Sequence, residues 1–103
     1  MKIYEGKRSQ NEVAVTVDGK ILSSRFDLWV YDFDGYEWGY GGSGALQLAL
    51  AILADHLDDE RKATAQCKLF ALEVIAKLPR TGWKLTSAQI DKTLEALVLQ
   101  SAK

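Results

Sequence analysis

A run of apolar residues between Ala45 and Ala54 constrains the fold of this chain more than any other feature. It reads Ala-Leu-Gln-Leu-Ala-Leu-Ala-Ile-Leu-Ala, and only Gln47 interrupts it. A helix that is apolar on nearly every side must be buried all round, so we expect a central helix at about Ala45–Leu57. The run is far shorter than the roughly 20 residues that a membrane span needs. The rest of the chain is therefore expected to cover this helix.

Two further helices are predicted after the apolar one. Apolar residues at helical spacing predict a helix at about Glu60–Leu78, which Pro79 ends. The segment Thr86-Ser87-Ala88-Gln89 resembles a capping box, with Thr86 as the N-cap and Gln89 at the third helical position. A third helix is expected to follow. Its apolar stripe would consist of Ile90, Leu94, Leu97 and Val98.

The first third of the sequence indicates strands, and Asp18-Gly19 is a two-residue hairpin signal. A second hairpin is expected around Asp34-Gly35. The simplest architecture is a single α+β domain over residues 1–103, in which a small antiparallel sheet packs against three helices with the apolar helix in the middle. The expected strands are Lys2–Glu5, Glu12–Asp18, Lys20–Leu22, Leu28–Phe33 and Tyr36–Tyr40.

A two-residue turn at Asp34-Gly35 would fix the register of the second hairpin. Side chains alternate along a strand, so six aromatic side chains would share one face. That face would either cover the helices or form a partly exposed binding platform. On the opposite face, Asp32 would lie across from Glu37, an unfavourable pairing of like charges. The six aromatic residues are Trp29, Tyr31, Phe33, Tyr36, Trp38 and Tyr40.

The glycine-rich turn Gly39–Gly44 lies between a predicted strand and the start of the apolar helix. Free N–H groups at a helix N-terminus favour an anion, and glycine permits a nest of such groups. Alternatively, the glycines let the helix begin close against the sheet, with Ser43 as N-cap. The spacing matches neither a Walker loop nor a Rossmann fingerprint. The candidate residues for binding a ligand or partner are Asp32, Asp34, Tyr36, Glu37, Trp38, Tyr40, Gly41, Gly42, Ser43 and Gly44.

Charge is unevenly distributed along the chain, although the net charge is only −1. From Phe26 to Glu60 there are eight acidic residues and no Lys or Arg, and the remaining segments hold all thirteen basic residues. A basic groove for nucleic acid is therefore not evident, and we do not expect direct nucleic-acid binding. The best candidates for such a stripe would be Arg61, Lys62, Lys68, Lys77 and Arg80.

No catalytic motif is recognisable, and we expect a non-enzymatic protein without cofactor or metal. His56 and Cys67 are the only residues of their kinds. His56 fits a charged group at a helix C-terminus among acids, and Cys67 falls on an apolar helical stripe where a thiol is inert. A lone cysteine and the absence of a signal-peptide core at the N-terminus agree with a cytoplasmic protein.

The segments Glu37–Gly44 and Gln47–Leu57 resemble the central block of a small family of uncharacterised proteins that are frequent in phages, prophages and plasmids. The resemblance spans most of the chain and implies no catalytic residues. It does imply a mobile-element setting, in which small non-enzymatic proteins often antagonise host defence. Family members tend to have a proline in place of Ala45 and a proline-containing stretch in place of Tyr31–Asp34, and such a stretch would not suit a regular strand.

Two functions follow as hypotheses. The first is a phage antagonist of host defence in the bacterial cytoplasm, which inhibits a nuclease or CRISPR-type complex by protein–protein contact through its acidic middle. The alternative is a protein that sequesters a nucleotide-type signal at the glycine-rich turn, with the aromatic residues holding the ring. A homo-oligomer is compatible with either hypothesis.

Overall fold

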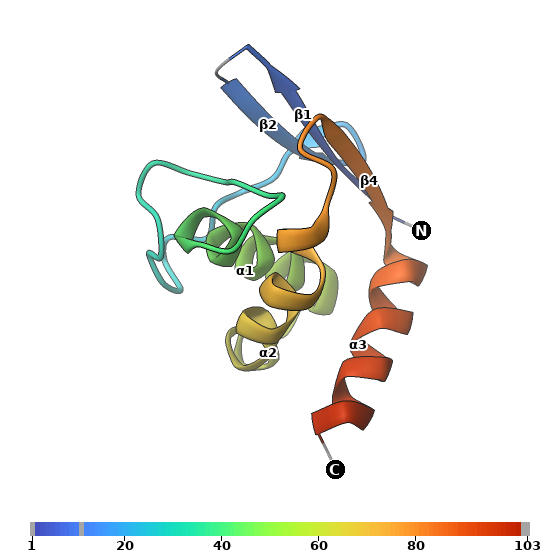
Figure 1. The fold of residues 1–103 in the computed structure, drawn as a ribbon. Coiled ribbons are helices and arrows are strands. Elements are labelled where there is room, and N and C mark those ends of the chain that lie inside the picture. Colours follow the sequence, from blue (N-terminus) through green and yellow to red (C-terminus); the bar gives the residue numbers. More distant parts are fainter. Residues whose placement is uncertain (1, 11, 102–103) are drawn as a thin grey trace.

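The computed structural model describes residues 2–10 and 12–101 and has the predicted α+β architecture. A four-stranded antiparallel sheet with the strand order β3-β2-β1-β4 lies beside three helices (Figure 1). The strands are β1 (Ile3–Ser9), β2 (Glu12–Val17), β3 (Lys20–Ile21) and β4 (Gly82–Thr86). The helices are α1 (Ser43–Leu57), α2 (Glu60–Glu73) and α3 (Ser87–Ser101), with a short 3₁₀ helix, η1 (Ile75–Lys77), after α2.

The hairpin between β2 and β3 forms at the predicted dipeptide. Asp18 and Gly19 both have left-handed backbone angles, with φ of 50° and 83°, as a type I′ turn requires. Val17 then pairs with Lys20, and Thr16 pairs with Ile21. The hairpin prediction is therefore confirmed.

Strand β4 was not among the predicted strands. It pairs with β1, and Gly6 lies opposite Trp83. A Cβ atom on Gly6 would lie 2.4 Å from the Trp83 ring, so glycine is needed at this position for the ring to cross β1. The strand character of β4 depends on this partner, which lies far away in the sequence.

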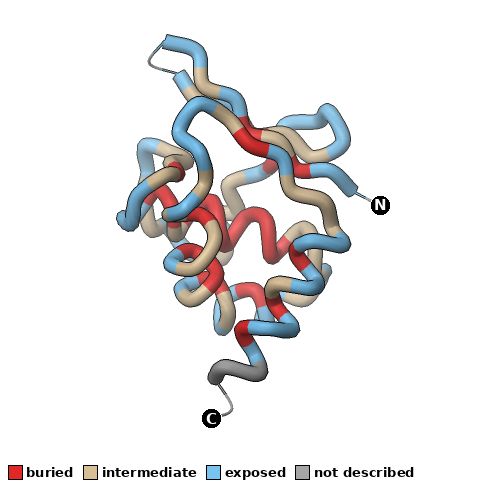
Figure 2. The backbone as a smooth tube through the Cα atoms, turned by 45° about the vertical axis from the view of Figure 1, so that its right-hand side comes forward, coloured by how far each residue is buried: buried red, intermediate tan, exposed pale blue. Residues whose placement is uncertain are grey.

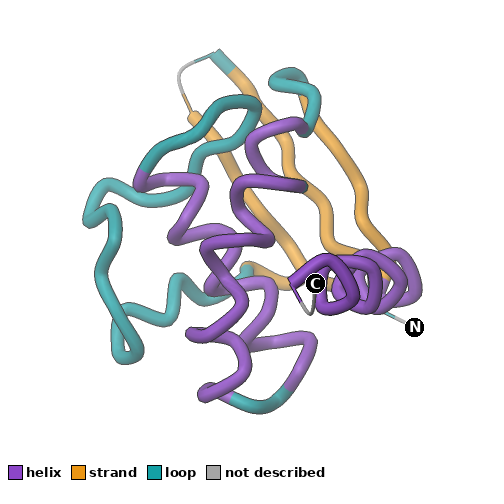
Figure 3. The backbone as a smooth tube through the Cα atoms, turned by 60° about the horizontal axis from the view of Figure 1, so that its bottom comes forward, coloured by secondary structure: helices purple, strands orange, loops and turns teal. Residues whose placement is uncertain are grey.

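The apolar helix α1 is buried all round, as predicted. Every residue from Gly44 to Ala54 is buried except Leu46, which is partly buried. Figure 2 shows this buried stretch at the centre of the molecule, and Figure 3 shows the helices lying in front of the sheet. α1 therefore forms the core that the sheet and α2 share.

The other two helices begin at the predicted residues, but α2 ends five residues before the predicted Leu78. α2 ends at Glu73, and η1 carries the chain on to Lys77, two residues before Pro79. The capping box before α3 is confirmed, because Gln89 N–H donates to Thr86 Oγ1 (3.2 Å) and Thr86 N–H donates to Gln89 Oε1 (2.9 Å). Among the residues that the structure describes, no helix has the length and hydropathy that a membrane crossing requires.

The predicted second hairpin does not form. Residues 22–42 contain no strand or helix; they form a long loop (hereafter the 22–42 loop) along one flank of α1 and α2 (Figures 1 and 3). Leu28–Phe33 and Tyr36–Tyr40 therefore do not pair as strands, and no shared face of six aromatic side chains exists. Instead the side chain of Gln47 binds four backbone groups of the loop, those of Ser24, Trp29, Tyr31 and Asp32.

Candidate functional site

Gly39 has a structural role in the glycine-rich turn. Its φ of 87° is left-handed, and its N–H donates to Ile75 O at 3.1 Å. A Cβ atom here would lie 2.5 Å from Arg80 Cγ. Glycine therefore avoids both backbone strain and a collision with the segment that follows η1. Between residues 39 and 44, Gly39 is the only residue with a left-handed backbone, so the successive turns of an N–H nest are not formed.

Helix α1 begins at Ser43, one residue earlier than it would if Ser43 were the N-cap. Gly42 is the N-cap in an extended conformation, and no side chain caps the helix. Ser43 Oγ donates instead to Asp32 Oδ2 at 2.8 Å, which places a carboxylate of the chain itself beside the helix N-terminus. A Cβ atom on Gly44 would lie 2.7 Å from Glu37 Cβ, so glycine allows the 22–42 loop to cross closely over the helix start.

The aromatic residues beside the turn do not form a common stacking platform. Trp38 is fully buried, its Nε1–H donates to Arg80 O at 3.1 Å, and the Trp83 ring meets it edge-on. Tyr36 is partly buried and donates to Leu22 O; burial raises the pKa of Tyr36 to about 12. Tyr40 is exposed beneath the Arg80 guanidinium. Of the three predicted aromatic contacts, Tyr40 alone is open to a planar ligand.

Glu37 forms an ion pair with Arg8 and does not face Asp32. The Arg8 Nη2 and Nη1 atoms lie 2.6 and 3.2 Å from the two carboxylate oxygens of Glu37, a bidentate geometry. The same guanidinium stacks on Trp38, 4.9 Å from the ring centroid. The hydrogen bonds from Arg8 hold the pKa of Glu37 below its ordinary value of 4.5. This pair ties the turn to the sheet, because Arg8 belongs to β1.

We expect Glu37→Gln to destabilise the fold by about 1 kcal/mol at pH 7, because a charged bidentate contact becomes a weaker neutral one. The Glu37 pKa is lowered by folding, so the stability that it adds is present above pH 4.5 and is lost as the pH falls through the lower, folded-state pKa. The difference between the two proteins should therefore shrink on acidification. Urea unfolding between pH 3 and 7 measures it.

A suitable control is Glu73→Gln, which removes the more exposed ion pair with Lys77 on α2. This change should alter the free energy of unfolding by less than about 0.5 kcal/mol at any pH. An equal loss in both variants at pH 7 would contradict a specific role for Glu37.

The acidic block of the sequence is partly neutralised by basic residues from outside it. Arg25 pairs with Asp27 and Glu60, and Lys2 pairs with Asp55. Asp59 caps α2 by accepting from the Lys62 backbone N–H. Asp27, Asp32 and Asp34 belong to the 22–42 loop itself, and Asp27 and Asp34 are exposed.

His56 and Cys67 occupy structural positions. His56 Nε2 lies 2.6 Å from Asp91 Oδ1 on α3, so its partner is not one of the neighbouring acids in the sequence. Cys67 is fully buried, with its Sγ near Thr64 O and Tyr31 Oη. In the described part of the chain, no group of three or more His, Cys, Asp or Glu side chains gathers where a metal ion could be held.

Gln47 anchors the 22–42 loop, a role that was not predicted from the sequence. The side chain is fully buried, and its Oε1 accepts from the N–H groups of Tyr31 (2.7 Å) and Asp32 (3.2 Å). Its Nε2 donates to Ser24 O (2.7 Å) and Trp29 O (3.1 Å). The signal in the sequence was the single amide in an otherwise apolar helix, since a buried polar side chain must find partners.

The anchored loop exposes large apolar side chains, here called the aromatic patch: Phe26, Trp29, Val30 and Phe33. Trp29 is 61% exposed and Phe33 is 81% exposed. The Phe26 and Phe33 rings stack with centroids 5.8 Å apart and planes within 3° of parallel, which brings the two ends of the segment together. Of the patch, only Trp29 and Phe33 were predicted from the sequence to lie on the aromatic face of a hairpin.

Comparison with known proteins matches the sequence of this chain to a family. The profile described as "Family of unknown function (DUF6166)" matches residues 4–96. The chain belongs to this family. The DUF6166 match runs from β1 into α3 and so includes the 22–42 loop, Gln47 and the glycine-rich turn. No curated protein and no solved structure matches the chain.

Proposed function

We propose that this DUF6166 protein is a non-enzymatic binding protein that holds a partner protein through the aromatic patch of its 22–42 loop. The observation that carries the proposal is the combination of a rigidly bound backbone with exposed rings. Gln47 fixes the loop at four backbone atoms, while Trp29 and Phe33 remain largely exposed. Packing of the core alone does not account for this arrangement, because these rings contribute little to the core.

The aromatic patch has the composition of an interface hot spot. Trp side chains are enriched among residues that dominate binding energy, and they bury a large area at little cost in side-chain entropy. A loop that is already fixed loses less conformational freedom when the partner binds. Both effects favour a partner with an apolar cleft that accepts Trp29 and Phe33.

Charge indicates what surrounds that cleft on the partner. Asp27, Asp32 and Asp34 lie within or next to the aromatic patch in the sequence, and no Lys or Arg occurs from Phe26 to Glu60. The Asp27 side chain is 63% exposed despite its contact with Arg25. Such a rim would attract a basic surface and repel an acidic one. The partner that fits is therefore a protein with an apolar cleft bordered by Lys or Arg.

The finer proposal is that this partner is a component of host defence, such as a nuclease or a CRISPR-type complex, blocked in the bacterial cytoplasm by a protein of a mobile element. Its support is the sequence resemblance to proteins of phages and plasmids, together with the acidic rim. Nuclease subunits carry basic surfaces for nucleic acid, which an acidic rim could approach.

The test is affinity capture from bacterial lysate, followed by a binding titration with the purified protein that is recovered. Truncation of both rings, Trp29→Ala with Phe33→Ala, should weaken binding by about 100-fold or more, because hot-spot truncations cost about 2 kcal/mol or more each. Thermal unfolding should change little, since both rings are largely exposed.

Ile21→Ser provides a matched control, because Ile21 is a large apolar residue, 89% exposed, that lies on β3 outside the loop. This variant should bind like the wild type. A partner held equally well by the double variant would contradict the role of the aromatic patch. A partner that is neither a nuclease nor part of a defence complex would agree with the binding role of the aromatic patch but refute the finer proposal.

The small-ligand alternative rests on a different hollow. Gly41 and Gly42 line a shallow, mainly apolar depression of about 320 Å³ that also includes Lys68. A nucleotide-type ligand would have Tyr40 for stacking, but not the buried Trp38. A thermal-shift screen with cyclic nucleotides and ADP-ribose derivatives separates the two functions. If a ligand raised the unfolding temperature of the wild type but not that of Lys68→Ala, the glycine-rich turn would be the binding site.

A further inference from the structure

Helix α3 is attached to the domain at its start by polar contacts. Ser87 N–H donates to Lys2 O at 2.9 Å, and Asp91 meets His56 on α1. Ile90 is fully buried, whereas Val98 near the other end is 54% exposed. Figure 1 shows α3 continuing away from the sheet on the side opposite the 22–42 loop. In the second half of α3, Leu97 is thus buried against the domain, whereas the neighbouring Val98 remains exposed.

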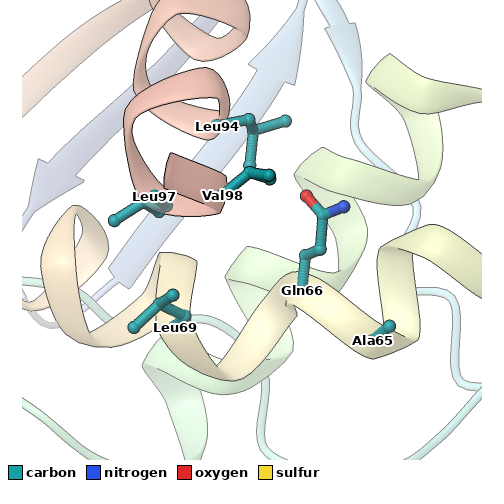
Figure 4. Close-up of a pocket in the computed structure, with 6 residues that line it drawn as sticks. All are labelled: Ala65, Gln66, Leu69, Leu94, Leu97 and Val98. Atoms are coloured by element: carbon teal, nitrogen blue, oxygen red, sulfur yellow. The ribbon is translucent and has the colours of Figure 1, made fainter. Parts of the chain in front are cut away.

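An apolar groove separates this half of α3 from α2. It has a volume of about 200 Å³ and is lined by Ala65, Gln66, Leu69, Leu94, Leu97 and Val98. Figure 4 shows that these side chains come from the two helices that form its walls. Gln66 is the one polar side chain of the lining. An apolar surface of this shape is suited to receiving another helix.

A second hollow continues the groove and carries opposite charges on its two walls. It shares Gln66, Leu94 and Val98 with the first and adds Lys62 from α2 and Glu95 from α3. Both charged residues are exposed. Neither the Lys62 ammonium nor the Glu95 carboxylate has an ion-pair partner among the described residues. One wall is thus basic and the other acidic, with an apolar floor between them.

We infer that the groove between α2 and α3 binds the same groove of a second copy of this chain, related by a two-fold axis. A two-fold interface brings one patch against itself, so each contact occurs twice in exchanged form. Val98 of each copy would enter the apolar groove of the other. Glu95 of each copy would meet Lys62 of the other. Because the groove has one basic and one acidic wall, it is complementary to the same groove of a second copy.

This dimer does not depend on the proposed function of the 22–42 loop. The loop and α3 lie on opposite flanks of the helical layer in both Figure 1 and Figure 3. Pairing through α3 would therefore leave both loops accessible. Two accessible loops on one dimer would add avidity toward a partner that presents more than one site.

The first measurement is sedimentation at protein concentrations from about 1 µM to about 1 mM, the range in which interfaces of modest affinity assemble. The mean mass should rise toward twice the mass of the 11.4 kDa chain as concentration increases. A mass that stays at that of one chain throughout this range would overturn the proposal.

Charge reversal tests which residues meet. Glu95→Lys and Lys62→Glu should each weaken self-association by about 10-fold or more, because like charges then face each other in both exchanged contacts. An equimolar mixture of the two variants should associate again, since every contact of the mixed dimer joins opposite charges. Recovery in the mixture is specific to contact between copies. A dimer unaffected by either reversal, or a mixture that does not recover, would overturn the assignment.

Val98→Asp tests the apolar contact and should abolish association at concentrations where the wild type is dimeric. Leu72→Asp is the matched control: Leu72 is 61% exposed on α2 but does not line this groove. Both variants should keep the wild-type unfolding temperature when measured as monomers. An equal loss of association in Val98→Asp and Leu72→Asp would show that the contact between copies does not depend on this groove.

Discussion

Replacing Gln47 with leucine is expected to destabilise the protein by about 2–5 kcal/mol, one of the two largest effects that we predict for a single substitution. Leucine fits the space and the helix, but it cannot bond the backbone groups of Ser24, Trp29, Tyr31 and Asp32 that the amide satisfies. Each backbone group left buried without a partner costs about 1–3 kcal/mol. Because the loop can shift toward water to recover some bonds, the total is smaller than the sum.

A loss of this size is a large fraction of the roughly 5–15 kcal/mol that stabilises a small domain. The effect should also be local, since the loop would open before the helices unfold. Urea unfolding gives the global loss. Hydrogen exchange of the amides in residues 22–42 gives the local one, and the N–H groups of Tyr31 and Asp32 should lose protection first.

Gln66→Leu is the matched control for this substitution. Gln66 lies on α2, is partly buried, and has no hydrogen bond from its side chain among the described residues. We expect it to change stability by less than about 0.5 kcal/mol. If Gln47→Leu unfolded at the same urea concentration as the wild type, Gln47 would not be the anchor of the loop.

The elements predicted correctly are those whose signals are local. The hairpin at Asp18-Gly19 follows from two residues that tolerate left-handed angles. The start of α3 follows from the reciprocal bonds of Thr86 and Gln89. The burial of α1 follows from its composition alone. None of these features needs a distant part of the chain.

The elements predicted wrongly depend on distant partners. Leu28–Phe33 has a strand-like composition, but the amide of Gln47 bonds its backbone, and no strand lies beside it. Conversely, Gly82–Thr86 is a strand because it pairs with β1, far away in the sequence. Strand propensity reflects the packing environment more than the backbone. The sequence could therefore not decide between these two segments.

The candidate site changed for the same reason. Glycine and aromatic residues beside a helix start are compatible with binding, but they equally allow the close crossings that Gly39 and Gly44 make. Whether a tryptophan is a core residue or a contact residue depends on tertiary structure. Here Trp38 is buried and Trp29 is exposed, although only nine positions separate them.

Trp38→Ala is the second substitution with a large expected effect, a loss of about 3–5 kcal/mol, as is typical when a buried tryptophan is truncated. Three contacts disappear together: the hydrogen bond to Arg80 O, the edge contact with Trp83, and the stacking of Arg8. The cavity also leaves the Arg8–Glu37 pair without its apolar support. Chemical unfolding followed by circular dichroism measures the loss.

Trp29→Ala is the control, because it removes the same side chain from a position that is 61% exposed. It should cost less than about 1 kcal/mol in stability, yet weaken partner binding strongly. Trp38→Ala, studied at a temperature where it remains folded, should bind nearly as well as the wild type. The opposite pattern, with Trp29 needed for stability and Trp38 for binding, would return the functional site to the glycine-rich turn. The two tryptophans thus separate the role of the core from the role of the surface within one loop.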